Sequence, residues 1–288
     1  MTKLETLNEF ISYPLNSTDE IMGRFATLPN AEWRKGNGKQ QQFVFVPGNR
    51  KDAVTLVAHA DTVFDFVEHN FSEEDGIIKS TTANCGLGAD DRAGCAILWL
   101  LKESGHNLLI TDGEEHGQIG AKWLINSNED IAEIIHNSAF IIQFDRRNGK
   151  DYKFYDIPVS EEFEKYIKQE TGYTNAGRSS FTDIVSLCNS RKSCCGVNIS
   201  VGYYNEHTPR EHLVIDEWLN TLNLTRQMVA ERIPQFNLDE QVRERLRQGR
   251  EERQRQAMTF SYWSEEDYQE LLSKYSVRTN RNDIIKDK

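Results

Sequence analysis

The chain has 288 residues, of which 38% are hydrophobic and 27% are charged, so it can bury the core of one large domain or two small ones. Its sequence has no apolar run near the roughly 18 residues of a membrane-spanning helix, and residues 1–13 lack a secretion-signal pattern. Five cysteines, an odd number without a Cys-x-x-Cys pair, argue against a disulfide framework and a cysteine zinc knuckle. We therefore expect a soluble cytoplasmic protein with reduced thiols.

The net charge of -11 is unevenly distributed. Residues 238–288 hold 11 basic and 11 acidic side chains, so the whole negative excess lies in residues 1–237. An acidic body repels phosphate backbones, which argues against nucleic acid as the partner. Clustered carboxylates can instead bind a metal.

Periodic patterns predict the elements in chain order. Residues 4–11 have helical spacing, a second helix starts near residue 17, and the turn Gly36-Asn37-Gly38 precedes a strand at 42–46. Short apolar runs then follow at 53–58, 107–111, 139–144 and 196–201, and helical stretches at 92–102, 119–125, 161–169, 182–188 and 213–232. Strands that alternate with helices predict an α/β fold with a mainly parallel sheet and helices on both faces, within a domain of residues 1–237.

Residues 238–288 have a different composition. The segment 242–258 is rich in Arg, Glu and Gln, and aromatic and leucine residues recur over 262–275. These patterns predict a charged helical extension: a solvated helix followed by a short amphipathic one. The extension either packs on its own domain or mediates oligomerisation or partner binding.

Polar side chains follow each of the predicted buried strands. They are His59 and Asp61, Glu114 and Glu115, Asp145, and His207. Ligands of open α/β sheets bind beyond the carboxyl ends of the strands. The sequence therefore predicts that these side chains share one crevice.

A glycine-rich segment, Gly86 to Gly94, adds paired aspartates just before a predicted helix. Its pattern matches no phosphate-binding loop, and two carboxylates would repel a pyrophosphate. The carboxylate of Asp90 suits a cation, although an N-cap role would be ordinary for a lone aspartate.

Imidazole and carboxylate ligands without cysteine favour zinc or a similar divalent ion. Alternation along a strand puts His59 and Asp61 on the same side, so Asp61 can accept a hydrogen bond from the other ring nitrogen of His59. The adjacent Glu114 and Glu115 must point apart, which lets one bind metal while the other carries a proton.

Together these motifs resemble the zinc-dependent exopeptidase superfamily, which includes di-zinc aminopeptidases, peptidase T and amidohydrolases that deacylate amino acids. The matching motifs are His59-x-Asp61, Gly88-x-Asp90-Asp91-x-x-Gly94, Glu114-Glu115-x-Gly117-x-x-Gly120-Ala121, Asp145 and His207.

The resemblance implies roles for these residues. One zinc ion would be bound by His59, Asp90 and Asp145, and the other by Asp90, Glu115 and His207. Glu114 would be the general base, and cobalt or manganese could replace zinc.

The chain departs from peptidase T in one segment. Residues 146–178 are too few for the inserted lid or dimerisation domain of peptidase T and the deacylases. The lid's contacts to the substrate carboxylate therefore have no counterpart here, and Arg146, Arg147, Arg178 or the extension are candidates to replace them.

Three functions remain open from the sequence. The first is removal of the amino-terminal residue of a peptide by zinc-activated water. The second is deacylation of an N-acyl amino acid. The third is a catalytically silent interaction protein, against which the complete ligand set and Glu114 argue, because a binding module needs no base.

Overall fold

The computed structural model describes residues 1–178, 180–188 and 194–261. The chain divides into two compact units, Met1–Glu240 and Gln241–Lys288. The predicted amphipathic helix over 262–275 lies outside the described residues.

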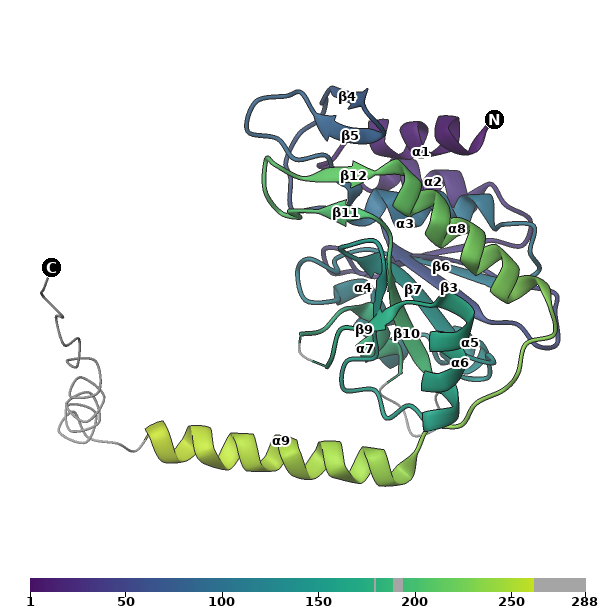
Figure 1. Ribbon diagram of the computed structural model, residues 1–288, viewed down its shortest axis with the longest axis vertical. Coiled ribbons are helices and arrows are strands. Elements are labelled where there is room, and N and C mark those ends of the chain that lie inside the picture. Colours follow the sequence, from purple (N-terminus) through teal and green to yellow (C-terminus); the bar gives the residue numbers. More distant parts are fainter. Residues whose placement is uncertain (179, 189–193, 262–288) are drawn as a thin grey trace, which may run out of the picture. The chain divides into compact units, whose positions relative to one another are not determined.

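The elements carry the labels of Figure 1. The helices are α1 (Lys3–Ser12), α2 (Asp19–Ala26), α3 (Ala89–Leu100), α4 (Ile119–Ser127), α5 (Glu129–His136), α6 (Glu161–Thr171), α7 (Asp183–Leu187), α8 (Ile215–Ala230) and α9 (Glu240–Ser261). The strands are β1 (Glu32–Lys35), β2 (Gln42–Val46), β3 (Thr55–His59), β4 (Phe71–Glu74), β5 (Ile77–Ser80), β6 (Asn107–Thr111), β7 (Ile141–Arg146), β8 (Asp151–Lys153), β9 (Thr174–Asn175), β10 (Gly196–Ser200), β11 (Tyr203–Tyr204) and β12 (His212–Val214).

The main sheet has eight strands in the order β1-β2-β6-β3-β7-β10-β8-β9. Its four central strands, β6, β3, β7 and β10, run parallel to their neighbours within that set. β2 pairs antiparallel with β6, and β8 pairs antiparallel with β10. Every residue of β3, β6 and β10 is buried, as expected for parallel strands covered on both faces. The predicted α/β fold with a mainly parallel sheet is confirmed.

Helices cover both faces of this sheet (Figure 1). α3 and α8 lie on one face, where the Trp218 indole donates to the carbonyl of Ala93 at 3.0 Å, and α1 packs on α3. α4, α5 and α7 lie on the other face. α6 packs through Phe163, whose ring lies 5.3 Å from that of Phe140.

A second sheet, which the sequence patterns did not predict, contains four short strands in the order β11-β12-β5-β4. All of its pairs are antiparallel. It is built from two hairpins, β4–β5 and β11–β12, that lie far apart in the chain. Its strands are too short and too exposed to give a clear period in the sequence. Its importance is that the β11–β12 hairpin includes His207.

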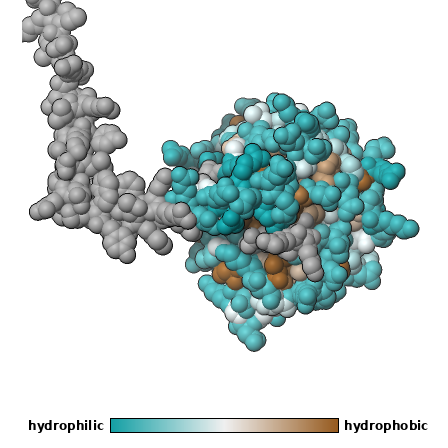
Figure 2. All heavy atoms as spheres, turned by 90° about the horizontal axis from the view of Figure 1, so that it is seen from below, coloured by the Kyte–Doolittle hydropathy of each residue, from teal (hydrophilic) through white to brown (hydrophobic). Residues whose placement is uncertain are grey.

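The surface of the folded chain is largely hydrophilic on the face that Figure 2 shows. None of the described helices combines the length and the apolar character that a bilayer crossing demands. α9 is the described part of the extension and carries i,i+3 and i,i+4 ion pairs from Arg247 to Glu244 and Glu251. Such pairs support a solvated helix.

Candidate active site

The polar residues predicted to follow the strands do meet at one edge of the main sheet. His59 is the last residue of β3, Asp145 lies near the end of β7, and Glu114 and Glu115 follow β6. Asp90 lies in the first turn of α3. Because β6, β3 and β7 are parallel neighbours, their carboxyl ends open into the same crevice.

Two groups of side chains converge here and share one aspartate. The first is His59, Asp90 and Asp145, and the second is Asp90, Glu115 and His207; within each group one ligand atom per residue lies within 4.8 Å of the others.

Three of the four distances within these groups lie close to the spacing of metal ligands, and the fourth, between His207 and Glu115, is a direct hydrogen bond that would have to lengthen by about half an ångström around an ion. His59 Nε2 lies 3.2 Å from Asp90 Oδ1 and 3.4 Å from Asp145 Oδ1. His207 Nε2 lies 3.2 Å from Asp90 Oδ2 and 2.8 Å from Glu115 Oε1. Tetrahedral zinc with bonds of about 2.0–2.2 Å separates its ligands by roughly 3.3–3.6 Å. The two oxygens of Asp90 thus face different imidazoles, as a bridging carboxylate requires.

The charges of the cluster point the same way. Burial alone would lower the pKa of His59, but Asp145, Asp61 and Asp90 raise it well above its ordinary value. Hydrogen bonds to Asp90 and Glu115 raise the pKa of His207 to about 11. The carboxylates therefore favour positive charge at this position, and a divalent cation bound to the neutral imidazoles would supply it.

Asp61 lies beside the other ring nitrogen of His59. Its Oδ1 is 3.3 Å and its carbonyl oxygen 3.0 Å from His59 Nδ1, which leaves Nε2 facing the carboxylates. Asp61 also accepts the backbone N–H groups of Glu114 at 3.1 Å and Glu115 at 3.3 Å. One side chain therefore positions both the imidazole and the glutamate pair.

The segment Asp90-Asp91 is held in place by hydrogen bonds from backbone amides to the Asp91 side chain. The peptide bond between the two residues is cis, and both have non-helical torsion angles. Asp91 accepts the backbone N–H of His59 at 3.1 Å and that of Gly94 at 3.0 Å. Asp91 therefore ties α3 to β3, while Asp90 is free to face the crevice.

Three neutral side chains orient Asp145. Gln143 donates to its Oδ2 at 3.0 Å, Thr182 donates to the same oxygen, and Tyr203 donates to Oδ1 at 3.2 Å. Oδ1 is also the oxygen that faces His59. Tyr203 is buried in the second sheet, so it links that sheet to the crevice.

Glu114 belongs to neither group but lines the same cavity. Burial and the neighbouring carboxylates of Asp145, Asp183 and Glu115 raise its pKa well above the ordinary value. A glutamate of raised pKa beside the crevice is suited to accept and donate a proton.

The patterns in the sequence missed Glu211. Its carboxylate accepts the backbone N–H groups of Gly88 at 2.7 Å and Asp90 at 3.0 Å, and it is 1% exposed. Burial raises its pKa to about 8, although those hydrogen bonds lower it. Because its partners are main-chain amides, no spacing of side chains could reveal it.

His207 reaches the site by an unpredicted route. It lies in the loop between β11 and β12 with a φ of 62°, rather than directly after β10. The distance to Glu115 depends on the hairpin, and the His207 side chain is 47% exposed.

The crevice is a cavity of about 330 Å³. Its lining combines the two groups with basic, aromatic and hydroxyl side chains: Asp90, Glu114, Glu115, Asp145, Arg146, Arg147, Lys153, Tyr155, Ser180, Phe181, Thr182, Tyr203, Glu206 and His207. Of the three arginines that the sequence offered as substrate contacts, Arg146 and Arg147 line this cavity. Arg178 does not, and it donates to the carbonyls of Tyr155 and Ile157.

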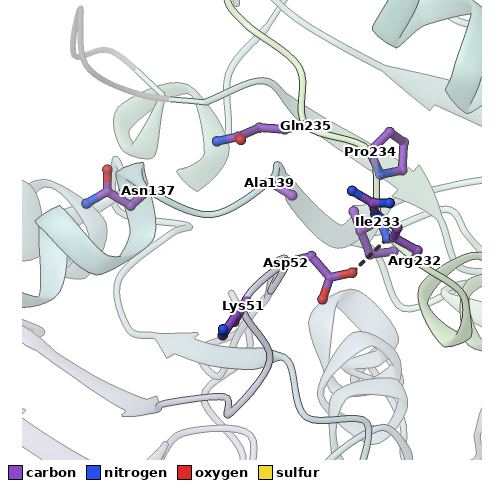
Figure 3. Close-up of a pocket in the computed structure, with 8 residues that line it drawn as sticks. All are labelled: Lys51, Asp52, Asn137, Ala139, Arg232, Ile233, Pro234 and Gln235. Carbon is purple, nitrogen blue, oxygen red and sulfur yellow. Dashed lines mark hydrogen bonds between the residues drawn. The ribbon is translucent and has the colours of Figure 1, made fainter.

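A larger cavity of about 460 Å³ lies near the start of β3 and β7 (Figure 3). Asp52 points toward Ile233 and accepts its backbone N–H at 2.9 Å. The other lining residues are Lys51, Asn137, Ala139, Arg232, Pro234 and Gln235. With one carboxylate and no histidine, this lining offers no metal ligand set, so the chemistry belongs to the smaller cavity.

Comparisons with solved structures agree with this architecture. Aminopeptidase PepT from Bacillus cereus has a TM-score of 0.56 at 15% identity, with 78% of this chain and 97% of that chain covered. A Staphylococcus aureus tripeptidase has a TM-score of 0.59 at 14% identity, with coverage of 79% and 97%. The TET1 peptidase of Pyrococcus horikoshii, which assembles into a tetrahedron or an octahedral shell, has a TM-score of 0.56 at 13% identity, with coverage of 80% and 100%.

This chain has the fold of these peptidases. The expected resemblance to exopeptidases is thereby confirmed at the level of the fold. No protein-family model and no curated protein matches the sequence.

Proposed function

We propose that the protein is a metal-dependent hydrolase of amide bonds, and specifically a di-zinc aminopeptidase that acts on short peptides. The observation that carries this proposal is the pair of converging groups that share Asp90. One zinc would be held by His59, Asp90 and Asp145, and the other by Asp90, Glu115 and His207. Cobalt or manganese could take the same positions.

Zinc supplies Lewis-acid polarisation of the scissile carbonyl and activation of water when it is bound. The chain's own residues then fix geometry. Asp61 sets the orientation of His59 and of the backbone at Glu114, and Tyr203 holds Asp145. These contacts keep the ligand atoms together before any substrate enters.

Glu114 would carry the proton. Its raised pKa suits a group that takes a proton from the attacking water and donates it to the leaving amine. The positive charge of bound metal would oppose part of that elevation of the pKa, so the carboxylate would be ionised at the start of each cycle.

A small substrate fits the cavity. Ligand pockets span about 300–1,000 Å³, and this cavity of about 330 Å³ lies at the lower end. Short peptides are consistent with two of the structural neighbours, an aminopeptidase and a tripeptidase.

Two further assignments belong to the proposal. Residues 1–237 form the catalytic domain, and the extension 238–288 is an appended segment that can mediate self-association. The acidic protein works in the cytoplasm, on peptides rather than on nucleic acids or membranes.

The test is the Glu114→Gln variant of the full-length protein, loaded with zinc. We expect two zinc ions per chain in both wild type and variant, measured by elemental analysis. We expect the variant to lose activity on an aminoacyl chromogenic substrate by about 10²–10⁴-fold, the range that a general base contributes.

The control is Glu129→Gln, which removes the same charge from an exposed position in α5 and should keep full activity. Unchanged turnover in Glu114→Gln would remove the mechanism. Hydrolysis of N-acyl amino acids alone would assign a deacylase, and no turnover of either class would assign a binding protein.

A further inference from the structure

Three basic side chains line the same cavity as the acidic groups: Arg146, Arg147 and Lys153. Two of them are neutralised by carboxylates of the chain. Arg146 binds Asp151 in a two-bond pair, with distances of 2.6 and 3.1 Å. Arg147 pairs with Glu206 at 2.7 Å.

Lys153 differs from both arginines. It is 6% exposed, and its ammonium group donates to Ser180 Oγ at 3.2 Å and lies 5.0 Å from the centre of the Tyr155 ring. Among the residues that the structure describes, no carboxylate forms an ion pair with it. Of the three bases, Lys153 is therefore the one whose direct partners among the described residues are a hydroxyl and an aromatic face, while the Asp151 carboxylate acts on its charge only from a distance.

The fold fixes this cation in place. Lys153 is the last residue of β8 and pairs with Asn198 of β10. Asn198 in turn accepts the backbone N–H of Asp145 at 2.9 Å and donates to Tyr155 Oη at 2.9 Å. The main sheet thus fixes the backbone of Lys153 relative to that of Asp145.

A buried ammonium without a counter-charge is unfavourable. Burial and the nearby Arg146 and Arg147 lower the pKa of Lys153, and the more distant Asp151 carboxylate offsets only part of that effect. A methionine would fill the same space without that cost, so the charge at this position is explained best by an anion that enters the cavity.

We propose that Lys153 binds a carboxylate of the substrate and so selects short amide substrates that carry a free acid. This inference rests on the proposed amide-hydrolase function. The carboxylate can be the α-carboxylate of a short peptide or an acidic side chain, and both would form the same charge-assisted pair.

The experiment measures binding, so that it does not depend on turnover. The full-length, zinc-loaded Glu114→Gln protein is titrated by calorimetry with alanyl-alanine and with alanyl-alanine amide. A second pair, alanyl-glutamate amide and alanyl-glutamine amide, tests the side-chain source. In at least one of the two pairs, we expect the ligand with the free carboxylate to bind about 10- to 100-fold more tightly than its neutral partner, as hydrogen bonds to charged groups imply.

The same titrations are repeated with Lys153→Met and with Lys150→Met in that background. Lys150 is an exposed lysine three positions away, so its variant removes the same charge outside the cavity. We expect Lys153→Met to reduce the preference to within twofold and Lys150→Met to retain it. Lys153→Met should melt at or above the temperature of its parent, which a lysine retained for stability would not do.

Two results overturn the inference: equal binding of acid and neutral ligands in the Lys153 protein, including no binding of either, or a preference that survives Lys153→Met. The proposed function fails separately, if zinc-loaded wild type hydrolyses none of the four ligands. An acid preference without hydrolysis would retain the carboxylate site alone.

Discussion

At the scale of single residues, the site depends on buried carboxylates whose charges are compensated to different degrees. Asp90 lies between two imidazoles, and their hydrogen bonds hold its pKa well below the usual range although burial opposes this. Asp183 has no such partner. Thr111 donates to its Oδ2, whereas its buried Oδ1 has no hydrogen-bond partner among the described residues.

Asp183 therefore gives a pH-dependent contribution to stability. Burial raises its pKa to about 7, so the folded protein binds more protons than the unfolded chain between about pH 4 and 7. The contribution of Asp183 to the free energy of unfolding then falls as pH rises through that window, by at most about 1.4 kcal/mol per pH unit.

Urea denaturation of the metal-free protein at several pH values tests this. The unfolding free energy of wild type minus that of Asp183→Asn should decrease from pH 4 to 7 and become constant above about pH 8. A difference that does not change with pH would show that Asp183 ionises normally in the folded state.

Most of the site residues that could be predicted from the sequence directly follow a buried strand, whereas Asp90 was indicated by its glycine-rich segment. His59, Glu114, Glu115 and Asp145 end or follow strands with clear apolar runs, so their convergence follows from parallel topology. Lys153 could not be predicted as a site residue, because it ends a three-residue strand that pairs antiparallel at the edge of the parallel core.

At the scale of elements, α3 is the part that must approach the sheet most closely. A Cβ atom at Gly94 would lie 2.2 Å from the carbonyl oxygen of Phe144 in β7 and 2.2 Å from Asp91 Oδ1. Glycine there lets α3 approach β7 and lets Asp91 accept the Gly94 N–H. The glycines around the aspartates were recognisable in the sequence, but their packing role was not.

We expect Gly94→Ala to destabilise the protein by about 1–3 kcal/mol, the usual cost of overpacking. Gly23→Ala in α2 is the matched control, because a Cβ at Gly23 meets nothing within 4 Å. That control should stabilise the protein by up to about 1 kcal/mol through helix propensity. Thermal unfolding of both variants measures the contrast, and equal effects of the two substitutions would contradict the packing argument.

The elements themselves divide in the same way. Strands such as β2 and β6 were predicted to the residue because their apolar runs are bounded by turn residues. The second sheet was not predicted, because β4 is mostly exposed and β11 has two residues. Such strands depend on partners distant in the chain, which no local period records.

At the scale of the whole molecule, the buried core of unit Met1–Glu240 is formed by residues up to Ile233, and Phe236 and Leu238 pack against it. Phe236 lies 5.1 Å from the Phe163 ring. The apolar contacts described for this core therefore extend to Leu238.

A chain truncated after residue 240 should unfold within a few degrees of the full-length protein in calorimetry. A chain truncated after residue 230 should lose several kcal/mol, because it lacks buried Ile233 and the aromatic contacts of Phe236. If truncation after 240 destabilises the protein as much as truncation after 230, the extension contributes to the stability of the domain. Light scattering of the same proteins tests the proposed role of the extension in self-association.

The route by which His207 reaches the site has a consequence for how metal would enter. His59, Asp90 and Asp145 all come from the main sheet and from α3, whereas the Glu115 group needs a half-exposed histidine on a separate hairpin. One position thus takes all three ligands from the main sheet and α3, with the hairpin only orienting Asp145 through Tyr203, while the other takes a ligand from the hairpin itself. The two positions should then bind metal in sequence. The position on the main sheet should be occupied at low metal concentration, and the position that includes the hairpin should be the first to lose its ion when metal is scarce.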